Sequence, residues 1–96
     1  MARPSARDIE TALQVIAPGA PEQDIRAVLF LAGDSKGLSK ASPQAAAWLS
    51  LVSHVRHSYS DYDALLADGY DRDAARFFCR DAINAVLAEW GCALRV

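Results

Sequence analysis

Two histidines one helical turn apart are the residues whose types and spacing could do chemistry in this chain. His54 and His57 are followed closely by two carboxylates, Asp61 and Asp63. Two imidazoles and a carboxylate could bind a metal ion, but no cysteine and no zincin-type glutamate accompanies them. Either histidine could instead act with Asp63 as a general acid or base. We favour a third interpretation, surface or helix-end histidines whose charge complements the helix dipole.

Arginines at the margins of two predicted helices add to this group. Arg76 and Arg80 lie along the edge of one apolar stripe, and Arg56 lies at the margin of another. An arginine at a core margin buries its stem and points its guanidinium at a carboxylate. We therefore expect a partly buried ion-pair network with Asp61 and Asp63. The alternative is an arginine and histidine cluster that receives an anion.

The elements that must position these side chains are helices. Apolar residues recur at helical spacing in several segments, and no window shows the strict alternation of a half-buried strand. Serine, aspartate, proline and glycine mark where the segments begin and end. The predicted helices lie between Ser5 and Pro18, between Pro21 and Gly33, from Pro43 to about His57, from Asp61 to about Asp68, with Ser60 as the cap, and from Arg72 to Trp90. We predict an all-α, five-helix single domain, orthogonal or bundle-like, with a core at about 5–91 and a flexible loop at about 33–42.

Composition narrows the class of protein. The 96 residues are 52% hydrophobic and 23% charged, with a net charge of −2, which fits one globular domain. A chain without a basic excess is a poor general binder of nucleic acid, although Arg72, Arg76 and Arg80 step along one helix side among aspartates. No apolar run suits a membrane span or a signal peptide. We expect a cytoplasmic protein with reduced thiols, Cys79 in the core and Cys92 exposed.

The segment around the histidines resembles a known family. Residues 54–66 read HVRHSYSDYDALL, and Ala75-Arg76 and Trp90 follow. This is similar to the signature Arg-His-x-x-Thr-x-Tyr-Asp-x-Leu-Leu, then Ala-Arg and a closing Trp, of a family of uncharacterised bacterial and fungal domains. Ser60 stands in place of the threonine and preserves a helix cap. The resemblance implies a small domain of unknown function, carries over no activity, and directs attention to Arg56, His57, Tyr62, Asp63 and Arg76.

Tyr62 and Asp63 are expected to hold the short fourth helix between its two long neighbours. We predict that Asp63 pairs with an arginine, either Arg56 or one of Arg76 and Arg80. The Tyr62 ring is expected to be buried with its hydroxyl bonded to a polar partner. Such a pair would be partly buried, so its loss would cost more than the loss of a surface ion pair.

These observations favour a non-enzymatic helical binding or regulatory module that acts through contacts with a protein partner or a second copy. The uncharged face around Ser50, Ser53 and His54 supports this hypothesis, as does Phe77, which is predicted to be exposed beside Phe78. No catalytic residue, metal or cofactor is expected. The alternative is a small enzyme or an anion or metal site built on the clustered histidines and arginines. The candidate binding residues are His54, Arg56, His57, Tyr62, Asp63, Arg76, Phe77 and Arg80.

Overall fold

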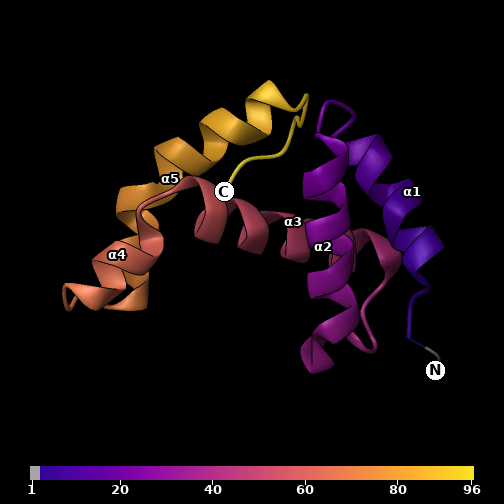
Figure 1. The fold of residues 1–96 in the computed structure, drawn as a ribbon, viewed down its shortest axis with the longest axis horizontal. Helices are drawn as coiled ribbons and strands as arrows, with labels where there is room; N and C mark the ends of the chain where they lie inside the picture. The colour runs from indigo at the N-terminus through magenta and orange to yellow at the C-terminus, as the bar shows by residue number, and fades with distance from the viewer. Residues whose placement is uncertain (1–2) are drawn as a thin grey trace.

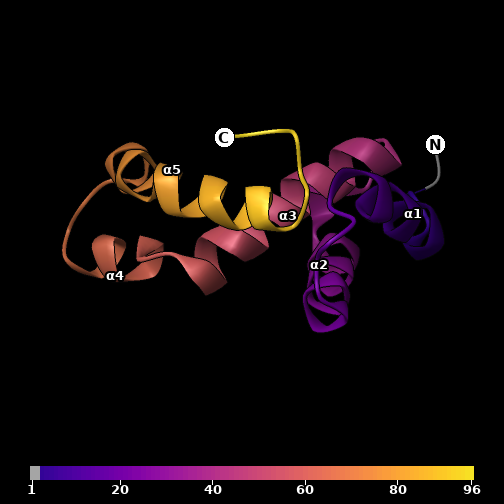
Figure 2. The same ribbon diagram turned by 90° about the horizontal axis from the view of Figure 1, so that it is seen from above.

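One central helix contacts all the other α-helices of this all-α domain. The computed structural model describes residues 3–96, and this part of the chain contains no strand. Its elements are α1 (Ala6–Ile16), α2 (Glu22–Asp34), the short 3-10 helix η1 (Lys36–Leu38), α3 (Pro43–Tyr59), α4 (Tyr62–Ala67) and α5 (Arg72–Glu89). Helix α3 packs against each of the other four α-helices, with α1 and α2 at one end and α4 and α5 at the other (Figures 1 and 2). The predicted five-helix class is confirmed.

Side-chain caps begin three of the helices where the sequence places them. The hydroxyls of Ser5 and Ser42 and the carboxylate of Asp71 each accept a hydrogen bond from a backbone N–H in the first turn of the helix that follows. Pro43 occupies the first turn of α3, where its missing N–H costs nothing. Among residues 3–96, no helix is both long and apolar enough to cross a membrane.

Two helix ends differ from the prediction. Helix α2 continues through Gly33 to Asp34, because Gly33 does not adopt the left-handed conformation that ends a helix. Helix α3 continues to Tyr59, so Ser60 follows it directly, although its hydroxyl still accepts a hydrogen bond from the Tyr62 N–H at the start of α4, at 3.3 Å. The Ser60 hydroxyl donates to the carbonyl of Arg56, and Asp61 takes the position before α4.

A left-handed glycine returns the end of the chain to the core. Gly91 has φ 78°, and the backbone N–H of Cys92 donates to the carbonyl of Leu87 at 2.9 Å. This bond satisfies one of the last carbonyls of α5 and seats Cys92 against the core. The prediction that Cys92 is exposed is therefore wrong: both cysteines are free and buried.

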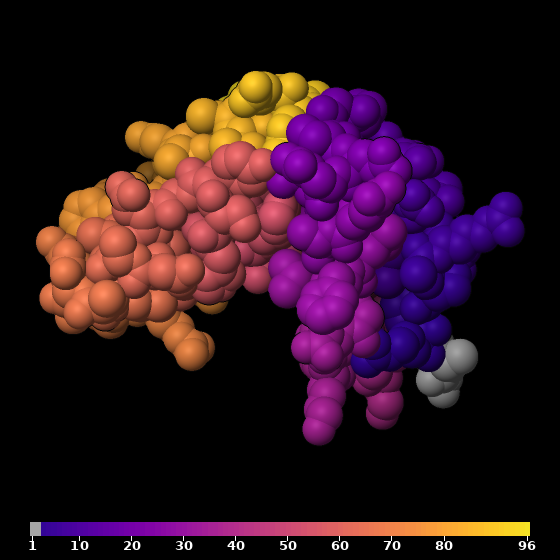
Figure 3. All heavy atoms as spheres, viewed as in Figure 1, coloured from indigo at the N-terminus to yellow at the C-terminus, as the bar shows by residue number. Residues whose placement is uncertain are grey.

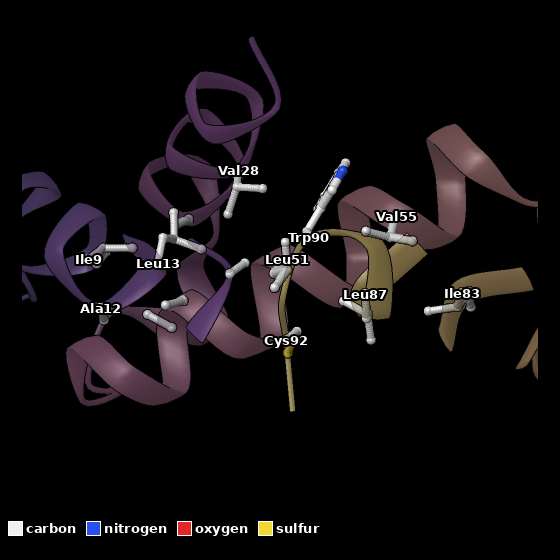
Figure 4. Close-up of a cluster of buried hydrophobic side chains, with 14 of the residues drawn as sticks. Ile9, Ala12, Leu13, Val28, Leu51, Val55, Ile83, Leu87, Trp90 and Cys92 are labelled. Carbon is white, nitrogen blue, oxygen red and sulfur yellow. The ribbon is translucent and has the colours of Figure 1, made fainter. Parts of the chain in front are cut away.

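The core follows the length of α3. Leu51 lies in the middle of the buried cluster, with Leu13 and Val28 on the side of α1 and α2 and with Val55 and Leu87 on the side of α5 (Figure 4). At the end of α5, the carbonyl of Trp90 accepts a hydrogen bond from the N–H of Gly19 at 2.9 Å. A Cβ atom at position 19 would come within 3.2 Å of the Trp90 backbone, a tighter contact than usual, so a larger residue would require the two segments to shift apart slightly.

Candidate functional site

The face of α3 that carries Ser50 and His54 is buried and does not face solvent. Helix α2 packs on this face, and both side chains are covered. The Nε2 atom of His54 lies 2.7 Å from Oδ1 of Asp24, in the first turn of α2. The interpretation of His54 as a surface or helix-end histidine is therefore wrong, because a carboxylate from another helix holds it inside the protein.

Asp24 is the centre of a small polar network that sequence reasoning missed. Its Oδ1 atom also accepts a hydrogen bond from the hydroxyl of Tyr59 at 2.7 Å, while its Oδ2 atom is buried without a partner. The hydrogen bond to Asp24 raises the pKa of Tyr59, with burial as a smaller cause. One signal could have revealed this carboxylate: Asp24 precedes Val28 and Ala32 by one and two helical turns and so shares their buried stripe.

The second histidine pairs with a different carboxylate, at the surface. His57 Nδ1 lies 2.8 Å from Asp63 Oδ1, and the two side chains are 47% and 62% exposed. The Tyr62 ring is buried, as predicted, and meets the His57 ring edge-on at 5.3 Å. The Arg56 guanidinium lies over the Tyr62 ring, 5.4 Å from its centre. The predicted pair between Asp63 and an arginine is therefore wrong: His57 takes the carboxylate, while Arg56 packs on the ring beside it.

Both histidines line one groove between α2 and α3. This histidine groove encloses about 370 Å³ and is formed by Ala27, Phe30, Leu31, His54, His57 and Ser58. Figure 3 shows the molecule hollowed beneath α3, between α4 and the C-terminal half of α2. The Ser58 hydroxyl lies 3.4 Å from Nδ1 of His54, at the long end of hydrogen-bond distances. Within residues 3–96, no three histidine, cysteine or acidic side chains come together as metal ligands would.

The arginines lie in a different groove, between α3 and α5. This arginine groove encloses about 250 Å³ and is formed by Arg56, Asp73, Arg76, Phe77, Arg80, Ile83 and Val96. In the described part of the chain, none of its three arginines forms an ion pair. The expected ion-pair network with Asp61 and Asp63 is therefore wrong. Asp63 binds His57, and Asp61 lines another hollow beside Tyr70 and Phe78.

The positive charges of this groove are close enough to disfavour one another. Burial lowers the pKa of Arg56, and the neighbouring charge of Arg76 lowers it further. The Nε atom of Arg56 is covered and has no hydrogen-bond partner among the described residues. Such a guanidinium is partly desolvated and has no ion-pair partner among the described residues. An anion in the groove would supply a counter-charge.

Exposed aromatic rings continue from the arginine groove along α5. Phe77 and Phe78 are 60% and 61% exposed, so the predicted exposure of Phe77 is confirmed. Their rings pack edge-to-face at 5.6 Å, and Tyr70 packs on Phe78 at the same distance. The guanidinium of Arg80 lies 5.2 Å from the centre of the Phe77 ring. Aromatic and arginine side chains in contact are typical of the centres of protein interfaces.

The structure thus separates the predicted site residues into two groups. His54 and His57 line the histidine groove, whereas Arg56, Arg76, Phe77 and Arg80 line the arginine groove. Tyr62 contacts both Arg56 and His57 and so lies between the groups, with Asp63 bound to His57.

Comparison with known protein families finds a match over most of the chain. A family described as "Uncharacterized conserved protein (DUF2293)" matches residues 12–91, which include all five helices in whole or in part. No curated protein and no solved structure matches the chain.

Proposed function

The chain belongs to this family of uncharacterised conserved proteins, and we propose that it is a non-enzymatic binding module that acts through protein–protein contacts. One observation carries the proposal: the arginine groove gathers three guanidinium groups with no ion-pair partner in residues 3–96, beside exposed phenylalanines. The net charge of the protein is −2, so this local excess of arginine does not reflect a basic composition.

The chemistry of this surface fits an acidic segment of another protein as the partner. Carboxylates of the segment would neutralise Arg76 and Arg80, which are exposed and already lie along one wall. An apolar side chain of the segment would cover Phe77 and Phe78, which pack as one aromatic unit. Burying these rings supplies affinity, and matching the charges supplies orientation and specificity.

Selection from a random peptide library displayed on phage tests this proposal. We expect the selected peptides to combine acidic and apolar residues and to lose about tenfold or more in affinity against the charge-reversal variant Arg76→Glu. The matched control is Arg72→Glu, which makes the same change on an exposed residue of α5 outside the groove. Peptides without acidic residues, or equal binding to the two variants, would contradict the proposal.

The histidine groove favours a second candidate function, a small enzyme that transfers an acyl group. Asp24 holds His54 by one ring nitrogen, and the other nitrogen faces the Ser58 hydroxyl. His54 would take the proton of Ser58 as the serine oxygen attacks an ester carbonyl, and would pass that proton to the alcohol that leaves. Water or a second alcohol would then attack the acyl-serine, release the acyl group and return the proton to Ser58. Labelling with a fluorophosphonate probe, followed by mass spectrometry, tests this candidate. If this candidate is right, the probe labels Ser58, and Asp24→Asn reduces the labelling. If Ser58 stays unlabelled in the folded protein, the candidate is ruled out.

A further inference from the structure

We infer that the arginine groove binds a phosphoryl group, a phosphate monoester carried on the partner segment. That a partner segment carries the phosphoryl group rests on the proposed function. The binding site itself is defined by side chains of α3 and α5. The charged side chains that line it are those of Arg56, Asp73, Arg76 and Arg80.

The charge of the groove matches a dianion better than a single carboxylate. Three guanidinium groups and the carboxylate of Asp73 leave a net side-chain charge of +2. A phosphate monoester carries a charge of about −1.5 to −2 at pH 7 and presents three acceptor oxygens. A glutamate or aspartate carries −1 and two acceptor oxygens, so it would leave one guanidinium without a partner. Planar arginine donors suit phosphate oxygens because each can donate two parallel hydrogen bonds.

Arg56 is held in place before any ligand arrives. Its stem is half-buried, its guanidinium lies over the buried Tyr62 ring, and its covered Nε atom has lost water on that side. Little side-chain entropy remains to be lost on binding, which favours affinity. Burial lowers the pKa of Arg56, and repulsion from the charge of Arg76 lowers it further. An anion between the two cations would relieve this repulsion.

Apolar walls strengthen the attraction between the groove and an anion. Ile83 is buried at the base, and Phe77 forms a side of the groove while its ring contacts the Arg80 guanidinium at 5.2 Å. These side chains exclude water and lower the local dielectric constant, so each charge interaction is stronger than at an open surface. Asp73 opposes the anion, and its replacement by asparagine removes that repulsion. Asp73→Asn is therefore expected to tighten phosphate binding.

Calorimetric titration at constant ionic strength tests this site. The ligands are inorganic phosphate and three degenerate peptide pools that are centred on phosphoserine, glutamate or serine. We expect the phosphoserine pool to bind at least tenfold more tightly than the glutamate pool, and inorganic phosphate to bind weakly and compete with it. Arg76→Gln should abolish both interactions, Asp73→Asn should strengthen them about threefold, and Arg72→Gln should leave them unchanged.

The possible outcomes separate the site from the proposed function. Phosphate binding that Arg76→Gln removes, without binding of any peptide, supports the phosphoryl site and contradicts peptide docking. Equal binding of the glutamate and phosphoserine pools, with no competition by phosphate, overturns the phosphoryl site and leaves acidic-segment docking supported. Phosphate binding that Arg76→Gln and Arg72→Gln reduce equally also overturns it, because the attraction would then be a general effect of charge. Circular dichroism spectra of each variant confirm that it folds.

Discussion

Asp24 of α2 and His54 of α3 form a buried pair, with the imidazole Nε2 atom 2.7 Å from the carboxylate Oδ1 atom. Their side chains are only 5% and 11% exposed, and Tyr59 donates to the same carboxylate oxygen. The pair joins the two helices that form the histidine groove. Its removal therefore tests how much polar contacts contribute to the packing of α2 on α3.

Asp24→Ala should lower the free energy of unfolding by about 2–4 kcal/mol, because it leaves two buried or half-covered polar groups without their acceptor. The matched control is Glu22→Ala, which removes the exposed ion pair between Glu22 and Arg26 on the same helix and should cost no more than about 0.5 kcal/mol. Urea denaturation of both variants measures the difference. Similar losses for the two would show that the buried pair does not stabilise the fold.

Tyr62 and Asp63 should contribute very unequally to the attachment of α4. Asp63→Ala breaks only an exposed pair with His57 and should cost less than about 1 kcal/mol. Tyr62→Ala removes a buried ring that contacts both Arg56 and His57, and should cost roughly 3–5 kcal/mol. Thermal melts of the two variants show which substitution causes the larger loss of stability. A larger loss for Asp63→Ala would restore the expectation of a buried ion pair.

Tyr59 should make the fold sensitive to alkaline pH. Its pKa is raised above the usual value of 10 because its hydroxyl donates to Asp24, so the folded state holds the proton more tightly than the unfolded state. The contribution of Tyr59 to stability is therefore fully present below pH 10 and is lost as the pH rises through the folded pKa. Tyr59→Phe should show a smaller loss of stability above pH 10 than the wild type. Tyr70→Phe, at an exposed tyrosine whose hydroxyl makes no hydrogen bond to a carboxylate among residues 3–96, is the matched control.

Gly91 should control access to the thiol of Cys92. An alanine there would adopt an unfavourable left-handed conformation and would place its Cβ atom 3.2 Å from Pro18, at a cost of about 1–2 kcal/mol from the backbone alone. Gly91→Ala should therefore release the tail and speed the reaction of Cys92 with Ellman's reagent. Gly69→Ala has similar backbone strain but an open surrounding space, and should leave the thiol protected. Equal reaction rates in these two variants would show that Gly91 does not hold Cys92 in place.

The helices could be predicted because their causes are local. Caps such as Ser5 and Asp71 act within one turn, and apolar spacing identified core residues such as Leu13 and Ile83. The partners of the polar residues could not be predicted in the same way. His54 is buried because α2 presents Asp24 to it, and that meeting depends on how two helices cross.

The choice between possible partners also needed the structure. Asp63 is within chain reach of Arg56 and of His57, and in the structure it meets His57 while Arg56 packs on the Tyr62 ring. The grouping of Arg56 with Arg76 and Arg80 depends on the crossing of α3 and α5. The sequence indicated the right residue types for a charged site, but it combined two grooves into one.

The hydrogen bond between Gly19 and Trp90 joins the loop after α1 to the end of α5. Two segments near opposite ends of the chain are therefore in direct contact. Contacts between such distant parts of a chain form late, because a long loop must be closed before the contact is gained. On the ribosome, α1, α2 and α3 emerge first, but Leu51 and Val55 remain partly uncovered until α5 follows. Folding of this domain is therefore completed only when the end of α5 has left the ribosome.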